Sequence, residues 1–221
     1  MPIYTTAELY DLSCTLAAPL LAETTWPWEA LAGIGDFIRA LGPALDPALY
    51  QHAAEDVWVA KDARVAPSAS ITGPCIIDSG ATLRHSAFIR GNAIIGKNAV
   101  VGNSSEVKNA ILFNGVQVPH FNYIGDSILG HRSHLGAGAI TSNVKSDKSP
   151  VVMCCEDERL DTARKKVGAF VGDGAEVGCN SVLCPGCVLG REVTVYPISC
   201  VRGQVPHRSI FKGPGEVVAK K

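Results

Sequence analysis

Apolar residues recur at every sixth position through most of this chain. An α-helix repeats every 3.6 residues and a half-buried strand every two, so neither produces a period of six. A fixed six-residue period is typical of a parallel β-helix, in which each hexapeptide supplies one short strand and one corner. The first run comprises Val59, Val65, Ile71, Ile77, Leu83, Ile89, Ile95, Val101, Val107 and Phe113, and the second comprises Val171, Val177, Leu183, Leu189, Val195 and Val201.

Small residues stand two positions before most of these apolar residues. Three hexapeptides make one triangular coil, whose aliphatic residues point inward and whose small residues fit the crowded inner corners. Each coil hydrogen-bonds to the next, so the coils are stable only as a stack. The small residues are Ala63, Ala69, Cys75, Ala81, Ala87, Ala93, Ala99, Ala169, Ala175, Ser181, Cys187 and Ser199. At one equivalent position, two residues before Val195, the larger Val193 is found instead.

Residues 1–54 lack this period and are predicted to form an N-terminal helical cap. Apolar residues at helical spacing indicate two packed helices, the first capped near Thr5 and the second with Pro27 in its first turn. We expect Trp26 and Trp28 to lie in the contact between these helices. Because open strand edges favour unwanted pairing, we expect the segment to cover one end of the coil.

The rest of the chain is predicted to be a β-helix over 55–205, with an inserted loop at 142–166, and a C-terminal tail at 206–221. The inserted segment is polar and contains Pro150, so it is expected to leave the coil as a loop or β-hairpin. The tail is expected to add one strand. Just before the insertion the period slips, with inward positions expected at Phe113, Val118, Ile124, Leu129 and Leu135.

Composition narrows the class of protein further. A net charge of −1 argues against a nucleic-acid partner bound by bulk charge. No apolar run reaches the roughly 18 residues that span a membrane, and no signal peptide is evident. Eight cysteines without a secretion signal indicate thiols kept reduced in the cytoplasm. We expect a cytoplasmic protein with neither a nucleic-acid nor a membrane partner.

The stretch 118–140, VPHFNYIGDSILGHRSHLGAGAI, concentrates the polar chemistry of the chain. Acetylation of an amine requires a proton acceptor, and histidine, with an ordinary pKa near ~6.5, serves at neutral pH. Backbone N–H groups of a glycine-rich turn such as 135–139 can closely approach an oxyanion. Arg and Lys on neighbouring coils suit a phosphate. The pattern indicates an acyltransferase.

Two motifs in this region, PHFNYIGDSILG and LGAGAITSN, carry a family resemblance. Over roughly 55–205 the chain resembles the C-terminal acetyltransferase domain of bifunctional N-acetylglucosamine-1-phosphate uridyltransferase/glucosamine-1-phosphate acetyltransferase. The resemblance implies a left-handed β-helix, acetyl-CoA as co-substrate, a homotrimer, and a step in UDP-N-acetylglucosamine biosynthesis. The family's nucleotidyltransferase domain has no counterpart in this sequence, so we do not expect the chain to make a sugar nucleotide by itself.

The resemblance also implies individual roles. His120 would be the general base, with Asn143 beside the acetyl group. The sugar phosphate would be held by Arg90, Lys108 and Tyr123. His134 replaces the family's sugar-binding asparagine, and this departure leaves the sugar open. Further departures, Val144 for tyrosine and Cys179 for serine, fall within the expected acetyl-CoA contacts, which are Ala137, Asn143, Val144, Cys179, Pro197 and Lys212.

Several alternatives stay open from the sequence. One is an acyltransferase of the same fold with another acceptor. Another is a non-catalytic coil that binds a sugar phosphate or sugar nucleotide and partners a separate nucleotidyltransferase. No metal is expected, although a zinc site would use His120, His131 and His134, and Cys184 with Cys187 forms a CxxC spacing. The basic run 164–166 is either a solvated surface or a contact for the CoA phosphates.

Overall fold

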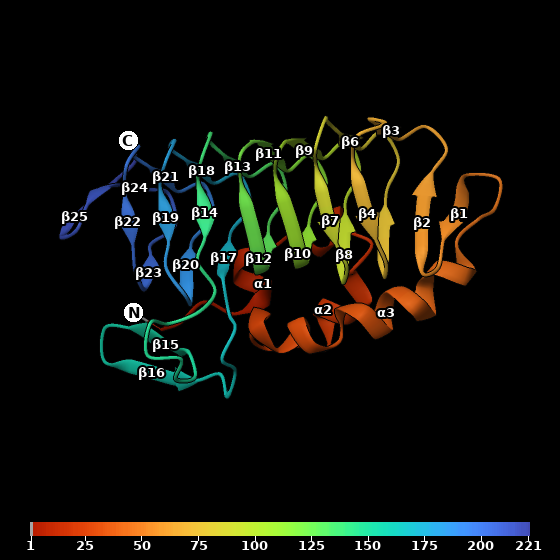
Figure 1. The fold of residues 1–221 in the computed structure, drawn as a ribbon. Coiled ribbons are helices and arrows are strands. Elements are labelled where there is room, and N and C mark those ends of the chain that lie inside the picture. Colours follow the sequence, from red (N-terminus) through yellow and green to blue (C-terminus); the bar gives the residue numbers. More distant parts are fainter. Residues whose placement is uncertain (1) are drawn as a thin grey trace.

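The computed structural model describes residues 2–221 and shows a parallel β-helix with short helices along one side (Figure 1). The coil has three walls of stacked short strands. The first wall, which we call the covered wall, includes the C-terminal ends of β10 (Glu106–Leu112) and β12 (Tyr123–Leu129). Its other strands are β2 (Val57–Ala60), β5 (Cys75–Ile77), β8 (Ala93–Ile95), β17 (Ala169–Val171), β20 (Cys187–Leu189) and β23 (Gln204–Val205).

The other two walls complete the triangle. The second contains the N-terminal ends of β10 and β12 with β4 (Ser70–Thr72), β7 (Phe88–Arg90), β14 (Ile140–Thr141), β19 (Val182–Leu183) and β22 (Cys200–Val201). The third is formed by β3 (Arg64–Val65), β6 (Thr82–Leu83), β9 (Val100–Asn103), β11 (Gln117–His120), β13 (His134–Leu135), β18 (Glu176–Val177), β21 (Thr194–Val195) and β24 (Ser209–Gly213).

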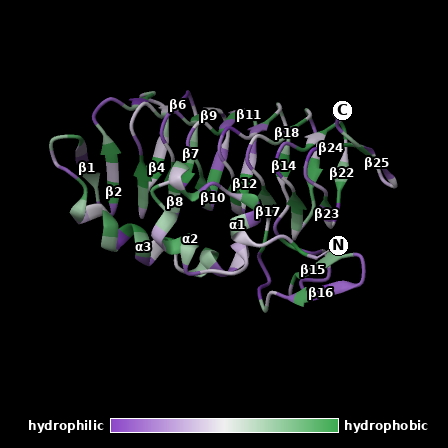
Figure 2. Ribbon diagram, turned by 180° about the vertical axis from the view of Figure 1, so that it is seen from behind, coloured by the Kyte–Doolittle hydropathy of each residue, from purple (hydrophilic) through white to green (hydrophobic). Residues whose placement is uncertain are grey.

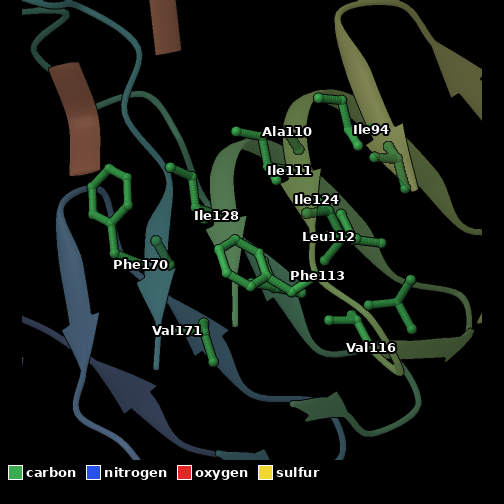
Figure 3. Close-up of a cluster of buried hydrophobic side chains, with 14 of the residues drawn as sticks. Ile94, Ala110, Ile111, Leu112, Phe113, Val116, Ile124, Ile128, Phe170 and Val171 are labelled. Atoms are coloured by element: carbon green, nitrogen blue, oxygen red, sulfur yellow. The ribbon is translucent and has the colours of Figure 1, made fainter. Parts of the chain in front are cut away.

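The aliphatic residues predicted to point inward line up from coil to coil. On the covered wall the row is buried throughout and comprises Val59, Ile77, Ile95, Leu112, Leu129, Val171, Leu189 and Val205. Figure 3 shows part of this core. The predicted fold class, a mainly β left-handed parallel β-helix of hexapeptide repeats with a short N-terminal helical segment, is confirmed.

The register of the slip differs from the prediction at one position. Leu112, not Phe113, aligns with Ile95 and Leu129. Each of two successive coils has lost one residue at the corner between the second wall and the covered wall. There the chain turns through Asn109 (φ 48°) and Asp126 (φ 49°), so β10 and β12 each run continuously around the corner.

The helices lie along a side of the coil, and the expectation that they cover its end is wrong (Figure 1). Val65 in the first coil is accordingly 37% exposed. The reason is a second apolar row, on the outer face of the covered wall, which the helices bury: Ile76, Ile94, Ile111, Ile128 and Phe170. The helical elements are α1 (Thr6–Leu9), η1 (Leu12–Cys14), α2 (Ala18–Ala22), η2 (Pro27–Ala32), α3 (Ile34–Leu41) and η3 (Gly42–Ala44).

The expectation of two helices is wrong, because the segment is divided into three short α-helices and three 3-10 helices. The predicted start signals are present. Thr5 and Glu8 form a capping box at the start of α1. Trp26 and Trp28 stack on each other at 5.4 Å, but Trp28 also meets Phe170 on the covered wall at 6.1 Å between ring centroids. The tryptophans therefore join the helices to the coil, in addition to joining the helices to one another.

The ends and the insertion are built from hairpins. β1 (Tyr50–Ala54) pairs antiparallel with β2, and β25 (Glu216–Ala219) pairs antiparallel with β24. The inserted segment contains the hairpin of β15 (Val152–Cys155) and β16 (Glu158–Asp161). Figure 2 shows strongly hydrophobic coil strands beside more mixed helices. No helix in residues 2–221 is long and apolar enough to cross a membrane.

Growth of a small corner residue is expected to destabilise the coil. Ala93 is fully buried and aligned with Cys75 and Ala110 on the adjacent coils. Ala93→Leu should therefore overpack the corner and lower the free energy of unfolding by about 1–3 kcal/mol in denaturant titrations. Asp147→Asn, at an exposed loop position, is the control and should change it by less than about 0.5 kcal/mol. Equal stability of the two variants would contradict the register.

Candidate functional site

The shortened corner creates a buried polar cluster around Asp126. The Asp126 carboxylate is only 5% exposed. It accepts a hydrogen bond from Asn109 Nδ2 at 2.9 Å and another from Asn143 Nδ2, and Lys108 Nζ lies 3.6 Å away. A buried carboxylate is stable when charged partners and donors surround it. We call Lys108, Asn109, Tyr123, Asp126 and Asn143 the Asp126 cluster.

Tyr123 joins this cluster through its hydroxyl group. Asn143 Nδ2 donates to Tyr123 Oη at 3.2 Å. Burial, reinforced by the neighbouring carboxylates, raises the pKa of Tyr123, so the phenol stays protonated and can donate a hydrogen bond to a ligand. Gly125 makes room for the ring, because a Cβ built there would lie 2.5 Å from Tyr123 Oη.

Arg90 lies on the coil preceding the cluster and is held by a carboxylate of its own. Its Nη1 lies 2.6 Å from Glu106 Oε1, and the hydrogen bond to Glu106 raises the pKa of Arg90. The charge of Arg90 also acts on Tyr123. Arg90, Lys108, Tyr123 and Asn143, four of the residues predicted for the site, therefore gather at one corner.

His120 lies at the next corner, in a row of residues that stack from coil to coil. His120 aligns with Asn103 on the preceding coil, and Gly138 N donates to His120 O at 3.0 Å. The same position recurs at Ala137, whose O accepts from Asn180 N at 2.8 Å, and at Cys179, whose O accepts from Ile198 N at 2.9 Å. We call these aligned residues, His120, Ala137, Cys179 and Pro197, the His120 row. The last three are predicted acetyl-CoA contacts.

Asn122 ties His120 to the glycine-rich turn. It is 2% exposed and accepts from His120 N at 3.0 Å. Its Nδ2 donates to the carbonyl groups of Gly136 and Ala139, each at 2.9 Å. The side chain of Asn122 therefore fixes the backbone of the histidine turn against the turn that would supply oxyanion donors.

The ring of His120 does not join the Asp126 cluster. Within residues 2–221, no hydrogen bond links the His120 imidazole to Tyr123, Asp126 or Asn143. The ring lines a cavity on the third wall together with His85 and Asn103. The predicted base and the predicted phosphate site thus occupy neighbouring corners of the coil.

Three predicted contacts lie elsewhere. His134 Nδ1 lies 2.8 Å from Glu176 Oε2 on the third wall, so the structure does not bring it to the cluster. Val144, 40% exposed, lines a separate cavity with Lys145 and Arg202. Lys212 Nζ lies 3.2 Å from Glu216 in the tail hairpin.

The residues considered for a metal have other neighbours. His131 Nδ1 lies 2.8 Å from the carbonyl oxygen of Asn114. Cys187 is fully buried, and Cys184 Sγ approaches Cys200 Sγ at 3.5 Å. Across residues 2–221, no three His, Cys, Asp or Glu side chains are grouped to hold a metal ion.

Sequence reasoning missed Asp126, Glu106 and Asn122. Two signals were present: Asp126 is the acid of the Gly-Asp in the first motif, and it lies where the period slips. Asn122 lies at a tight corner between His120 and Tyr123, where a buried amide can satisfy the backbone groups of two turns. Glu106 had no comparable signal.

The fold and the motifs define a β-helix protein of the hexapeptide-repeat class. The chain belongs to the family described as GMPPB C-terminal domain, whose profile matches residues 71–213. It is 32% identical over 107 residues to a "Bifunctional sugar-1-phosphate nucleotidylyltransferase/acetyltransferase" of Sulfurisphaera tokodaii, covering 48% of this chain and 27% of that protein. It is 36% identical over 116 residues to a "Bifunctional protein GlmU" of Methanocaldococcus jannaschii, covering 52% and 28%.

The chain therefore spans about a quarter of the length of these relatives, and the predicted resemblance is confirmed over about half of this chain. Among solved structures, a putative acetyltransferase of Bacillus cereus aligns with a TM-score of 0.47 at 14% identity, covering 72% of this chain and 77% of that one. The polySia specific acetyltransferase NeuO aligns with a TM-score of 0.44 at 13% identity, covering 76% and 88%.

Proposed function

We propose that this chain is an acetyl-CoA-dependent N-acetyltransferase whose acceptor is an amino-sugar 1-phosphate. The observation that carries the proposal is the Asp126 cluster, in which Lys108 and Asn143 meet the Asp126 carboxylate and Asn143 also holds Tyr123, one corner away from His120. The name of the Sulfurisphaera tokodaii relative, which combines sugar-1-phosphate nucleotidylyltransferase with acetyltransferase, agrees with this choice.

In the proposed reaction the neutral amine nitrogen of the sugar attacks the thioester carbon of acetyl-CoA. His120 takes one N–H proton from that nitrogen as the C–N bond and a tetrahedral oxyanion form. Gly136 N and Gly138 N already donate to Val177 O and His120 O, so the Ala137 N–H would be the donor of this turn that stabilises that oxyanion. The C–S bond breaks, and the CoA thiolate leaves with the proton returned from His120. The His120 row would hold acetyl-CoA along successive coils, past Ala137, Cys179 and Pro197.

The phosphate of the acceptor would bind at the neighbouring corner. Arg90 offers a fork of donors and Lys108 a point charge, and both are held in place by carboxylates. Tyr123 adds a neutral hydroxyl donor. Positioning the amine beside the thioester supplies a large part of the rate of such reactions.

The direct test is to incubate the protein with acetyl-CoA and a panel of amino-sugar 1-phosphates and to follow release of free thiol. We expect acceptor-dependent release with at least one member. Absence of release with every amino sugar, with or without a phosphate, would refute the N-acetyltransferase proposal. Release only with a different class of acceptor would leave an acyltransferase of the same fold.

Arg90→Ala is expected to weaken acceptor binding more than turnover. Because the residue would contact only the phosphate, its loss should raise KM for the acceptor by about tenfold or more while kcat at saturation falls less. Steady-state kinetics measure both. Arg39→Ala, which removes an exposed arginine paired with Asp36 and Asp56, is the control and should change neither constant. An unchanged acceptor KM in Arg90→Ala would exclude this phosphate site.

We further propose that the protein is a homotrimer with sites between subunits. Apolar side chains stand exposed near the His120 row, at Phe121 (61%), Tyr196 (44%) and Ile198 (83%). Burying them against a neighbour would remove apolar area from water and close the open side of the site. Sedimentation velocity should show a trimer. A stable, fully active monomer would contradict the shared site. A cytoplasmic location, consistent with the eight free thiols, is part of the proposal.

A second candidate is a non-catalytic sugar-phosphate or sugar-nucleotide binding module that partners a separate nucleotidyltransferase. Three observations favour it. His120 stands apart from the Asp126 cluster, His134 is paired with Glu176, and the matching family is described as a C-terminal domain. Sugar-phosphate binding without thiol release would select this candidate.

A further inference from the structure

A cavity beside His120 carries a concentration of positive charge that the acetyl-transfer scheme does not use. It has a volume of about 640 Å³ and lies on the third wall at the first coils. Arg64, Thr82, Arg84, His85, Asn103 and His120 supply its polar lining, and apolar residues of the first coils, Ala63, Val65, Ala66 and Leu83, form the rest. Its volume falls within the range of about 300–1,000 Å³ found for ligand pockets.

The charges of this cavity are unbalanced. No carboxylate is among its lining residues. Within residues 2–221, neither Arg64 nor Arg84 forms an ion pair, whereas Arg90 and Lys108 each have a carboxylate within 4 Å. An unpaired guanidinium presents several N–H donors in a fixed fork that matches phosphate oxygens. Two of them facing one cavity favour an anionic ligand.

Hydrogen bonds hold the other side of the cavity in order. His85 Nδ1 lies 3.1 Å from Ser68 Oγ on the preceding coil, which leaves Nε2 available. Asn103 Nδ2 donates to His85 O at 3.3 Å, and Asn103 is aligned with His120 on the following coil. His85, Asn103 and His120 therefore form an ordered polar ladder at the rim, along three successive coils.

We propose that this cavity is a second phosphoryl-binding subsite, separate from the Asp126 cluster, in which Arg64 and Arg84 bind a phosphate or diphosphate group. The assignment of its ligand to the reaction at His120 rests on the proposed function. Two phosphoryl sources have the required chemistry: the diphosphate or 3′-phosphate of CoA, which would then extend from His120 toward the N-terminal coils instead of past Cys179 and Pro197, and a second phosphoryl group on the acceptor. In either case the bound anion places its ligand beside the imidazole of His120.

The test uses inorganic pyrophosphate as the probe, with the full-length protein at low ionic strength and without acetyl-CoA. Isothermal titration should detect binding that weakens as salt is added. Arg64→Gln/Arg84→Gln should weaken it by about tenfold or more, because two charge-assisted contacts are lost. Arg208→Gln, an arginine paired only with Glu192, is the matched control and should bind as wild type does. No binding, or equal affinity in the double variant, would overturn the subsite.

Competition distinguishes the two sources of phosphate. Displacement of pyrophosphate by CoA would identify the cofactor, and weaker displacement by 3′-dephospho-CoA would assign the contact to the 3′-phosphate instead of the diphosphate. Displacement by a diphosphate-linked amino sugar would identify the acceptor. If neither displaces it, the link to the reaction at His120 is wrong. Because the measurement requires no turnover, arginine-dependent binding in a protein that releases no thiol would refute the proposed function and leave the subsite intact.

Discussion

Replacing His120 with asparagine is expected to lower the rate of acetyl transfer by about 10²–10⁴-fold. Asparagine is close to histidine in size and polarity but does not accept a proton at neutral pH. Because Arg90, Lys108 and Tyr123 would bind the phosphate at the neighbouring corner, KM for the acceptor should barely change. Thiol release under saturating acetyl-CoA and acceptor, measured at pH 7 to 8, gives both constants.

The matched control for this variant is His52→Asn. His52 lies exposed on β1, stacked on Trp58 at 5.2 Å and outside both the Asp126 cluster and the His120 row. Its replacement should leave kcat within about twofold of wild type. Nearly full turnover in His120→Asn, together with unchanged acceptor binding in Arg90→Ala, would show that the active site is not in this part of the coil.

The fold was largely predictable because one physical constraint repeats along the chain. Each coil requires inward aliphatic residues such as Ile77 or Ile95, so the six-residue period recurs many times along the sequence. The exact register was not predictable where a corner was shortened. There Leu112 and Phe113 are both apolar and both buried, and sequence spacing alone does not say which one aligns with Ile95.

The inward row of apolar residues does not predict where the helices lie, because a second apolar row faces outward. Pairs such as Ile76–Ile77 and Ile94–Ile95 place one apolar side chain inside the coil and the next one outside. Repeated on several coils, these pairs indicate a wall that another element must cover. At the end of the coil, Val65 stays partly exposed to solvent. The continuous apolar row on the outer face of the covered wall, in contrast, is buried by the helices.

The candidate site was predictable where its motifs were local and less so where the period changed. Tyr123 and Asn143 come from two separate motifs and meet in the structure. Asp126, which holds them together, had no assigned role, because its burial depends on the two shortened corners. His134 lies on the third wall, where it is aligned with Glu176 and faces outward because its neighbour Leu135 is buried in the coil.

Trp28→Ala is expected to cost about 3–5 kcal/mol of unfolding free energy, the usual range for removing a large buried aromatic side chain. Trp28 is 4% exposed and packs on Phe170, so its loss opens a cavity between η2 and the covered wall. For a chain of this length the melting temperature should fall by roughly 6–20 °C in calorimetry.

Trp26→Ala is the matched control for this loss. Trp26 is only partly buried and stacks on Trp28, so its removal should cost about 1 kcal/mol, in the range of an aromatic pair. If the helices only packed on one another, the two tryptophans would matter about equally. A large loss in Trp28→Ala with a small loss in Trp26→Ala is expected if the covered wall anchors the segment. Equal losses would contradict that anchor.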